Sequence, residues 1–189
     1  MMDLLQLKAK EMRDLKPKER KQKLRRMKQR GQEKIINGVP YYSVNSYKKY
    51  IQQPKTDREA TNFEKAQKRV DATIEELVKK YPEPEYKIWV NPATGRGADI
   101  IVAKKKASSR YKPYIVYELT NYDRQSYISE RDIKRYIETL KQFQCKKKLI
   151  VSYEENLYNK KTKTNYRNLL EDNGIEIEIK GEIPLNNKF

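Results

Sequence analysis

The sequence predicts an α/β protein in which a mixed β-sheet forms the core and helices flank it. Three observations support this class. From residue 57 onward, the predicted elements run helix, three strands, helix, strand, helix, strand. Residues 130–143 carry apolar side chains every three or four positions, which is typical of a helix that packs one face on a sheet. Residues 148–153 form a short, almost wholly apolar run, as expected of an interior strand.

The composition suits one core with a polar extension, because 37% of the 189 residues are charged and 37% are hydrophobic. There is no run of 18 apolar residues, and Lys8 and Lys10 interrupt the first apolar stretch. We therefore expect neither a membrane span nor a secretory signal. The single cysteine, Cys145, cannot form an internal disulfide. Together these features predict a soluble protein of the cytoplasm.

The chain contains no histidine. This excludes Ser-His and Cys-His nucleophiles, zinc hydrolases built on histidine, and a histidine general base. Carboxylates that hold Mg²⁺ or Mn²⁺ remain available for hydrolysis, with lysine as an assisting cation or base. The absence of histidine thus favours phosphodiester chemistry.

The formal net charge of +17 favours a polyanionic partner, with nucleic acid as the leading candidate. Much of this charge is local, since residues 8–30 hold twelve Lys or Arg and three acids, a net of +9. A membrane surface would also attract such a segment, but a lipid-binding helix needs a bulky apolar face. Leu15, Leu24 and Met27 are too few to form one.

Residues 1–56 are interpreted as a basic, largely helical arm, with Pro17 in the first turn of a second helical piece and Gly31 at its end. The arm either holds nucleic-acid backbone or is a solvated tail, and its charge density favours the first interpretation. Asn37 and Gly38 form a turn signal that leaves residues 35–51 open between a short hairpin and irregular packing. Nucleic-acid contacts are expected from Lys21, Lys23, Arg25, Arg26, Lys28, Arg30, Arg96 and Arg124.

A folded domain is expected over residues 57–189. It begins with an amphipathic helix over 57–81, with Thr61 as the N-cap and Glu64 three positions later. Prolines at 82 and 84 end this helix, a strand follows at 86–90, and residues 91–97 form a turn.

Two carboxylates lie on the next two strand-like runs, Asp99 within residues 97–102 and Glu118 within residues 114–120. If the turn is centred on residues 105–112, Lys104 faces Pro113, and equal steps outward bring Asp99 opposite Glu118. Directly opposed Cβ atoms are about 5 Å apart, and like charges there repel. The pair therefore predicts a bound cation, although two unrelated surface acids at strand edges remain the alternative.

The remaining elements follow a polar loop that contains Arg124. They are a helix over 130–143, a strand over 148–153, a helix over 165–172 that ends at Asn173-Gly174, and a last strand over 175–179.

The ordered set of a helix acid (Phe63-Glu64), an Asp strand (residues 93–99) and a Glu strand (residues 117–120) resembles the PD-(D/E)XK nuclease superfamily. It is most similar to the archaeal Holliday junction resolvase-like branch, over residues 60–180. The resemblance implies a restriction endonuclease-like fold, a homodimer, and Mg²⁺ or Mn²⁺ held by Asp99, Glu118 and Glu64, with the carbonyl after Glu118 as a further ligand. Glu64 is alternatively a capping-box acid, in which case Glu75 or Glu76 would replace it.

One position departs from the family pattern. The lysine expected two residues after the Glu is Thr120, which carries no charge. Three interpretations stay open: the lysine function has moved to Lys134 or Arg131 on the next helix, the metal alone suffices, or cleavage has been lost.

The sequence thus predicts a Mg²⁺- or Mn²⁺-dependent endonuclease that acts on duplex or branched DNA, with catalytic candidates Glu64, Asp99, Glu118, Thr120 and Lys134. The resemblance to resolvase-like enzymes implies selectivity for DNA structure. A catalytically inactive DNA-binding protein on a nuclease fold is the alternative, and a basic RNA-associated or packaging protein is the third. Its richness in Lys, Tyr, Ile and Asn is similar to that of small proteins of archaeal viruses and plasmids, which would place it inside a host cell.

Overall fold

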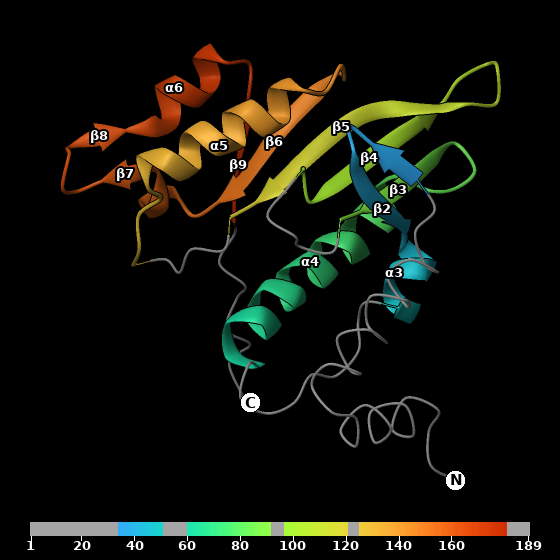
Figure 1. Ribbon diagram of the computed structural model, residues 1–189, viewed down its shortest axis with the longest axis horizontal. Helices are drawn as coiled ribbons and strands as arrows, with labels where there is room; N and C mark the ends of the chain where they lie inside the picture. The colour runs from blue at the N-terminus through green and yellow to red at the C-terminus, as the bar shows by residue number, and fades with distance from the viewer. Residues whose placement is uncertain (1–33, 51–59, 92–96, 121–124, 181–189) are drawn as a thin grey trace, which may run out of the picture. The chain divides into compact units, whose positions relative to one another are not determined.

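The computed structural model describes residues 34–50, 60–91, 97–120 and 125–180, and the side chains of 50 and 60–68 are outside the description (Figure 1). The chain forms two compact units, Met1–Gly95 and Arg96–Phe189. The expected nucleic-acid contacts of the arm, together with Arg96 and Arg124, lie outside the described residues. No helix in the described segments is long and apolar enough to cross a membrane.

The first unit contains a three-stranded antiparallel arrangement. Strands β1 (Lys34–Ile36) and β2 (Val39–Ser43) form a hairpin, and β2 also pairs with β3 (Tyr86–Val90). The turn at Asn37 and Gly38 has φ values of 49° and 75°, the left-handed conformation that two-residue hairpin turns require. Of the two possibilities left open for this stretch, the structure shows the hairpin. β2 lies within residues 1–56, so this part of the expected arm contributes a strand to the first unit.

Two helices belong to the same unit, α3 (Val44–Tyr50) and α4 (Ala60–Lys80). The predicted helix over 57–81 is therefore confirmed with small differences at its ends. Val70, Ile74 and Leu77 on α4 are buried, at the spacing that puts them on one helix face.

The second unit contains a four-stranded mixed sheet in the order β4-β5-β6-β9, labelled in Figure 1. Its strands are β4 (Ile100–Lys105), β5 (Tyr111–Leu119), β6 (Lys147–Ser152) and β9 (Glu176–Ile179). β4 and β5 pair antiparallel, whereas β5 with β6 and β6 with β9 pair parallel. Helix α5 (Glu130–Lys141) leads into β6, and α6 (Tyr166–Asp172) leads into β9. This architecture confirms the predicted α/β class with a mixed sheet.

Two local features explain why α5 forms: an N-cap at its start and an apolar face that is buried. Ser129 is the N-cap, and its hydroxyl oxygen accepts a hydrogen bond of 3.1 Å from the Asp132 N–H. Four side chains of the predicted stripe are buried, namely Ile133, Tyr136, Ile137 and Leu140. After α6, Gly174 has a φ of 68°, which agrees with the predicted helix end.

The segment between β6 and α6 was not predicted to be structured. It contains a 3₁₀ turn, η1 (Glu154–Leu157), and a small hairpin of β7 (Tyr158–Asn159) and β8 (Thr164–Asn165). The Asn159 side-chain oxygen accepts hydrogen bonds from the N–H groups of Lys161 and Thr162, which fixes the turn.

The register of β4 on β5 changes along the hairpin. Ile100 pairs with Tyr117 and Val102 with Ile115, but beyond a bulge Lys104 pairs with Lys112. The expected pairing of Lys104 with Pro113 is therefore wrong by one residue, because Tyr114 is an extra residue on β5. At the other end, the pairing of Ile100 with Tyr117 agrees with the predicted count that leads to Asp99 and Glu118.

Candidate metal site

Asp99 is held at the end of β5 by two hydrogen bonds. It directly precedes β4, and its backbone N–H donates to the Tyr117 carbonyl at 3.0 Å. Its carboxylate Oδ2 accepts from the Leu119 N–H at 2.7 Å. Since Tyr117 and Leu119 flank Glu118, these bonds bring the two acidic residues together as the sequence predicted.

Glu118 lies on β5 and is 9% exposed. Its Oε2 atom is buried and has no hydrogen-bond partner. Unpaired buried carboxylate oxygens are costly, so such an atom requires an explanation. A cation that the carboxylate binds is one explanation, and the electrostatics of the pair agree with it.

Both carboxyl groups hold their protons more tightly than usual. Burial raises the pKa of Asp99 to about 6, against the opposing effects of the Leu119 N–H, Arg135 and Lys180. Burial and the nearby charge of Asp99 raise the pKa of Glu118 well above its ordinary value, and Arg135 acts in the opposite direction. A buried acid next to a half-buried one whose charge disfavours its ionised form is a site that a positive ion would stabilise.

The donor atoms fit a hard divalent ion. Mg²⁺ commonly binds one or two carboxylates and keeps several waters, so Asp99 and Glu118 suffice as its side-chain ligands. No group of three or more Asp, Glu or Cys side chains that could hold a metal occurs among the described residues. The third predicted ligand, Glu64, is on α4 in the first unit, and its side chain lies outside the description.

Lys180, which follows β9, is a functional candidate that the sequence reasoning missed. Its Nζ donates to the Thr120 carbonyl oxygen at 2.6 Å, and its backbone N–H donates to the Ser152 carbonyl at 2.8 Å. Its charge lowers the pKa of Asp99. The signal was available, because the carboxyl ends of parallel strands meet at one sheet edge and a lysine directly follows the last predicted strand.

Arg135 on α5 was also missed. Its charge lowers the pKa of both Asp99 and Glu118. Its guanidinium also pairs with Asp132 at 3.1 Å and lies over the Tyr136 ring. It is therefore a second cation whose field reaches the acid pair.

The other two catalytic candidates have structural partners. Thr120 is fully buried, and its Oγ1 lies 3.2 Å from the Val151 carbonyl oxygen and 3.0 Å from the Ser152 Oγ. Lys134 is 65% exposed and pairs with Glu130 at 2.7 Å, one turn earlier on α5. The structure thus brings together Asp99, Glu118 and Lys180, and it places Lys134 on the solvated face of its helix.

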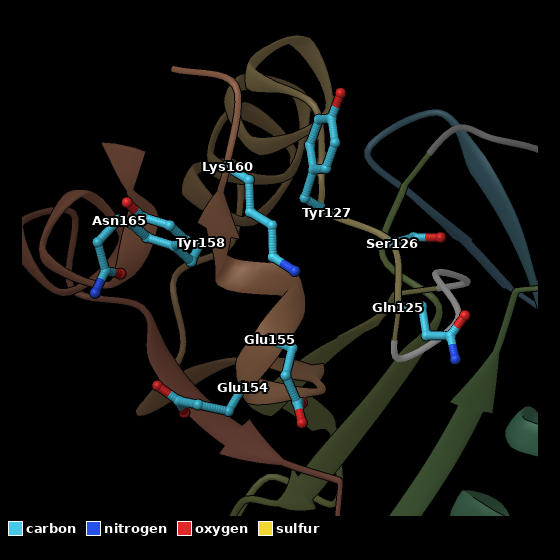
Figure 2. A pocket seen from close by; sticks show the side chains of 8 residues that line it. All are labelled: Gln125, Ser126, Tyr127, Glu154, Glu155, Tyr158, Lys160 and Asn165. Atoms are coloured by element: carbon cyan, nitrogen blue, oxygen red, sulfur yellow. The ribbon is translucent and has the colours of Figure 1, made fainter. Parts of the chain in front are cut away.

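The second unit contains a cavity of about 600 Å³, and Figure 2 shows the side chains that line it. A buried polar network connects the cavity to the candidate metal site. From Thr120 the network passes through Ser152 to Asn156, both fully buried, with 3.5 Å between the Ser152 Oγ and the Asn156 Oδ1. The Asn156 side-chain amide donates to the Ser126 carbonyl at 2.6 Å. Ser126 lines the cavity, together with residues of η1 and of the β7–β8 hairpin. The end of β5 is therefore fixed to the wall of the cavity.

No protein-family model, curated protein or solved structure matches this chain. We therefore infer its function from the chemistry of the site.

Proposed function

We propose that the protein is a divalent-metal-dependent DNA endonuclease of the PD-(D/E)XK type, in which Asp99 and Glu118 hold Mg²⁺ or Mn²⁺. The observation that carries the proposal is the buried acid pair. Glu118 has a carboxylate oxygen without a hydrogen-bond partner, and the nearby charge of Asp99 raises the cost of ionising Glu118. A divalent ion between them would remove both costs.

A bound Mg²⁺ or Mn²⁺ supplies a water of lowered pKa and neutralises charge on the scissile phosphate. The chain's own residues position this chemistry. The Leu119 N–H fixes the Asp99 carboxylate, and burial excludes competing water from Glu118. Lys180 contributes a positive charge that would favour the approach of a phosphate, which two carboxylates alone would repel.

DNA as the substrate follows from the net charge of +17 and from the resemblance to nucleases. Selectivity for DNA structure, action as a homodimer and a location inside the cell are part of the same proposal. They derive from the resemblance and the composition.

A DNA-binding protein that has lost cleavage is the second candidate. The observation that favours it is Thr120, whose hydroxyl is buried in hydrogen bonds at the position where the family has its lysine. Under this alternative the acid pair remains as a structural feature.

A cleavage assay separates the two candidates. Labelled four-way junctions and linear duplexes are incubated with the full chain in Mn²⁺, Mg²⁺ or EDTA. The matched variants are Asp99→Asn and Glu138→Gln, the latter a neutralised exposed acid on α5. Metal-dependent products that Asp99→Asn abolishes and Glu138→Gln retains support the nuclease. DNA binding without products in every metal overturns it and supports the second candidate.

Calorimetry with Mn²⁺ alone tests the metal site independently of cleavage. We expect wild type and Glu138→Gln to bind Mn²⁺ and Asp99→Asn to lose that binding. Equal binding by all three proteins would place the metal elsewhere and would remove the basis of the proposal.

A further inference from the structure

A basic surface lies at the opposite end of the β4–β5 hairpin from the acid pair. Residues 103–117 contain no Asp or Glu, and neither do residues 139–153 on the neighbouring segment. Because β5 pairs with both β4 and β6, the register brings these two segments together. The lysines and arginine that they carry are Lys104, Lys105, Lys106, Arg110, Lys112, Lys141, Lys146, Lys147 and Lys148.

Three of these lysines, Lys104, Lys112 and Lys146, form together with Tyr114 what we call the tip surface. Lys104 and Lys112 are directly opposite each other in the antiparallel register. Like charges at such positions repel and weaken the pairing of the strands. A polyanion bound across the two strands would offset this repulsion.

Tyr114, the extra residue of the β-bulge, is surrounded by cations. The Lys104 Nζ lies 5.7 Å and the Lys146 Nζ 5.5 Å from its ring centroid, within cation–π range. The Lys146 Nζ also donates to the Tyr114 hydroxyl at 3.3 Å. The ring therefore holds two long side chains near each other, which reduces the entropy that they lose when they bind a ligand.

The surface is polar throughout. The residues of the turn between the strands are exposed, and they include Ala107, Ser108 and Ser109. The exposed large hydrophobic side chains of the described residues are Ile35, Val78, Tyr158, Leu169 and Ile179, none of which is on this hairpin. A lipid surface needs apolar side chains that insert below the headgroups, so the tip surface fits a phosphate backbone better than a membrane.

We propose that the tip surface binds the phosphate backbone of DNA through Lys104, Lys112 and Lys146. The inference rests on the proposed function in its choice of DNA as the partner. It goes further by adding a contact surface on the folded second unit to the contacts expected of the basic arm. Each lysine that neutralises a phosphate releases counterions and contributes about 0.9 to the slope of log affinity against log salt.

The test measures binding of a linear duplex by the full chain in EDTA, over a range of salt concentrations. The variant combines Lys104→Gln, Lys112→Gln and Lys146→Gln. The control combines Lys160→Gln, Lys161→Gln and Lys163→Gln, exposed lysines of the β7–β8 hairpin in the same unit. Both proteins lose three charges. We expect the salt slope to fall by about 2 to 3 and affinity to fall more than tenfold only for the tip variant.

Equal losses for the two triple variants would show a general charge effect and would overturn the inference. A cross-linking amino acid at position 114 gives a second measurement, with position 158 on β7 as the control. We expect DNA adducts from position 114 in excess of those from 158, and equal yields would contradict the inference. Binding to phosphatidylserine vesicles is the third measurement. A tip variant that loses vesicle binding but keeps DNA binding would assign the surface to lipid and overturn the proposal.

The proposal for the tip surface and the nuclease proposal can be disproved independently of each other. EDTA removes cleavage from the binding test, so the tip surface can hold when no metal-dependent products form. Conversely, a nuclease whose tip variant binds DNA like the control would leave the acid pair intact and remove only this inference.

Discussion

Lys180 and Thr120 follow two strands that are not neighbours in the sheet, yet the Lys180 Nζ donates a hydrogen bond of 2.6 Å to the Thr120 carbonyl oxygen. Thr120 follows β5 and Lys180 follows β9, and β6 lies between those strands. The contact brings a cation from the end of the last strand to the residue two positions after Glu118. It thus places a positive charge near the position where the resemblance to PD-(D/E)XK nucleases would lead one to expect a lysine.

We predict that Lys180→Met slows single-turnover DNA cleavage by about 10–100-fold, because a positive charge that faces the phosphate is lost. The same variant should bind Mn²⁺ more tightly, since a cation that competes for Asp99 has been removed. Lys180→Arg should retain most of the activity. A purely structural role predicts slower cleavage without tighter Mn²⁺ binding.

Lys134→Met is the matched control for this experiment. Lys134 is 65% exposed and pairs with Glu130 on α5, so its loss should leave the cleavage rate within twofold of wild type. A large loss in Lys134→Met would instead support the interpretation, left open by the sequence, that the lysine function has moved to this residue.

The stability of the metal-free protein should fall as the pH is raised from about 4 through 6. Asp99 has a pKa of about 6 in the folded chain against 3.8 in the unfolded chain, so the folded state binds the proton more tightly. Its contribution is fully present below pH 3.8 and is lost as the pH rises through 6. We expect about 2 kcal/mol after solvent screening of this half-buried group is allowed for.

Urea unfolding in EDTA between pH 4 and 8 measures this effect as the difference between wild type and Asp99→Asn. The variant lacks the titrating group, so its stability should depend less steeply on pH. Saturating Mn²⁺ should cancel the difference in slope by holding the carboxylate ionised. Parallel curves for wild type and Asp99→Asn in EDTA would contradict the raised pKa.

Thr120→Val should destabilise the fold by about 1–3 kcal/mol, since it removes a buried hydroxyl that hydrogen-bonds at the ends of β5 and β6. Thr120→Ser keeps the hydroxyl and should cost less. If Thr120 has only this structural role, the cleavage rate per folded molecule should be unchanged in both variants. A loss of rate at full folding would instead assign Thr120 to the chemistry.

Leu140→Ala should cost about 2–5 kcal/mol of unfolding free energy, because Leu140 is fully buried on the sheet-facing side of α5. Leu169→Ala on α6 is the control, since Leu169 is 38% exposed, and its cost should stay below about 1 kcal/mol. Thermal denaturation measures both. Equal costs would contradict the packing of α5 described above.

The sequence predicted those elements in which the spacing of apolar residues indicates the buried face. Ile133, Tyr136, Ile137 and Leu140 repeat with helical spacing and are buried as expected. The acid pair was predicted by counting outward from an expected pairing of Lys104 with Pro113. The structure pairs Lys104 with Lys112, and the bulge at Tyr114 brings the count back into agreement before Asp99 and Glu118. The short strands β7 and β8, with two residues each, have no periodicity to detect.

The remaining features depend on contacts between distant residues, which local patterns do not encode. The bulge at Tyr114 shifts the register of β4 on β5 by one residue, and no residue pattern near Pro113 indicated that shift. Lys134 was one of two candidates on the helix that follows the Glu strand, yet it pairs with Glu130 within its own helix. Lys180 is 60 residues from Thr120, and their contact depends on the order of parallel strands.

Strand β5 carries Lys112 near one end and Glu118 near the other, and hydrogen bonds to β4 and β6 keep it extended. Six strand residues span about 20 Å, which is about six base-pair steps of B-form duplex. A nuclease that binds the DNA backbone near Lys112 and cleaves it near Glu118 would measure a fixed distance along the DNA. The cleaved bond would then lie at a constant distance from the phosphates bound at the tip surface, whatever the base sequence between them.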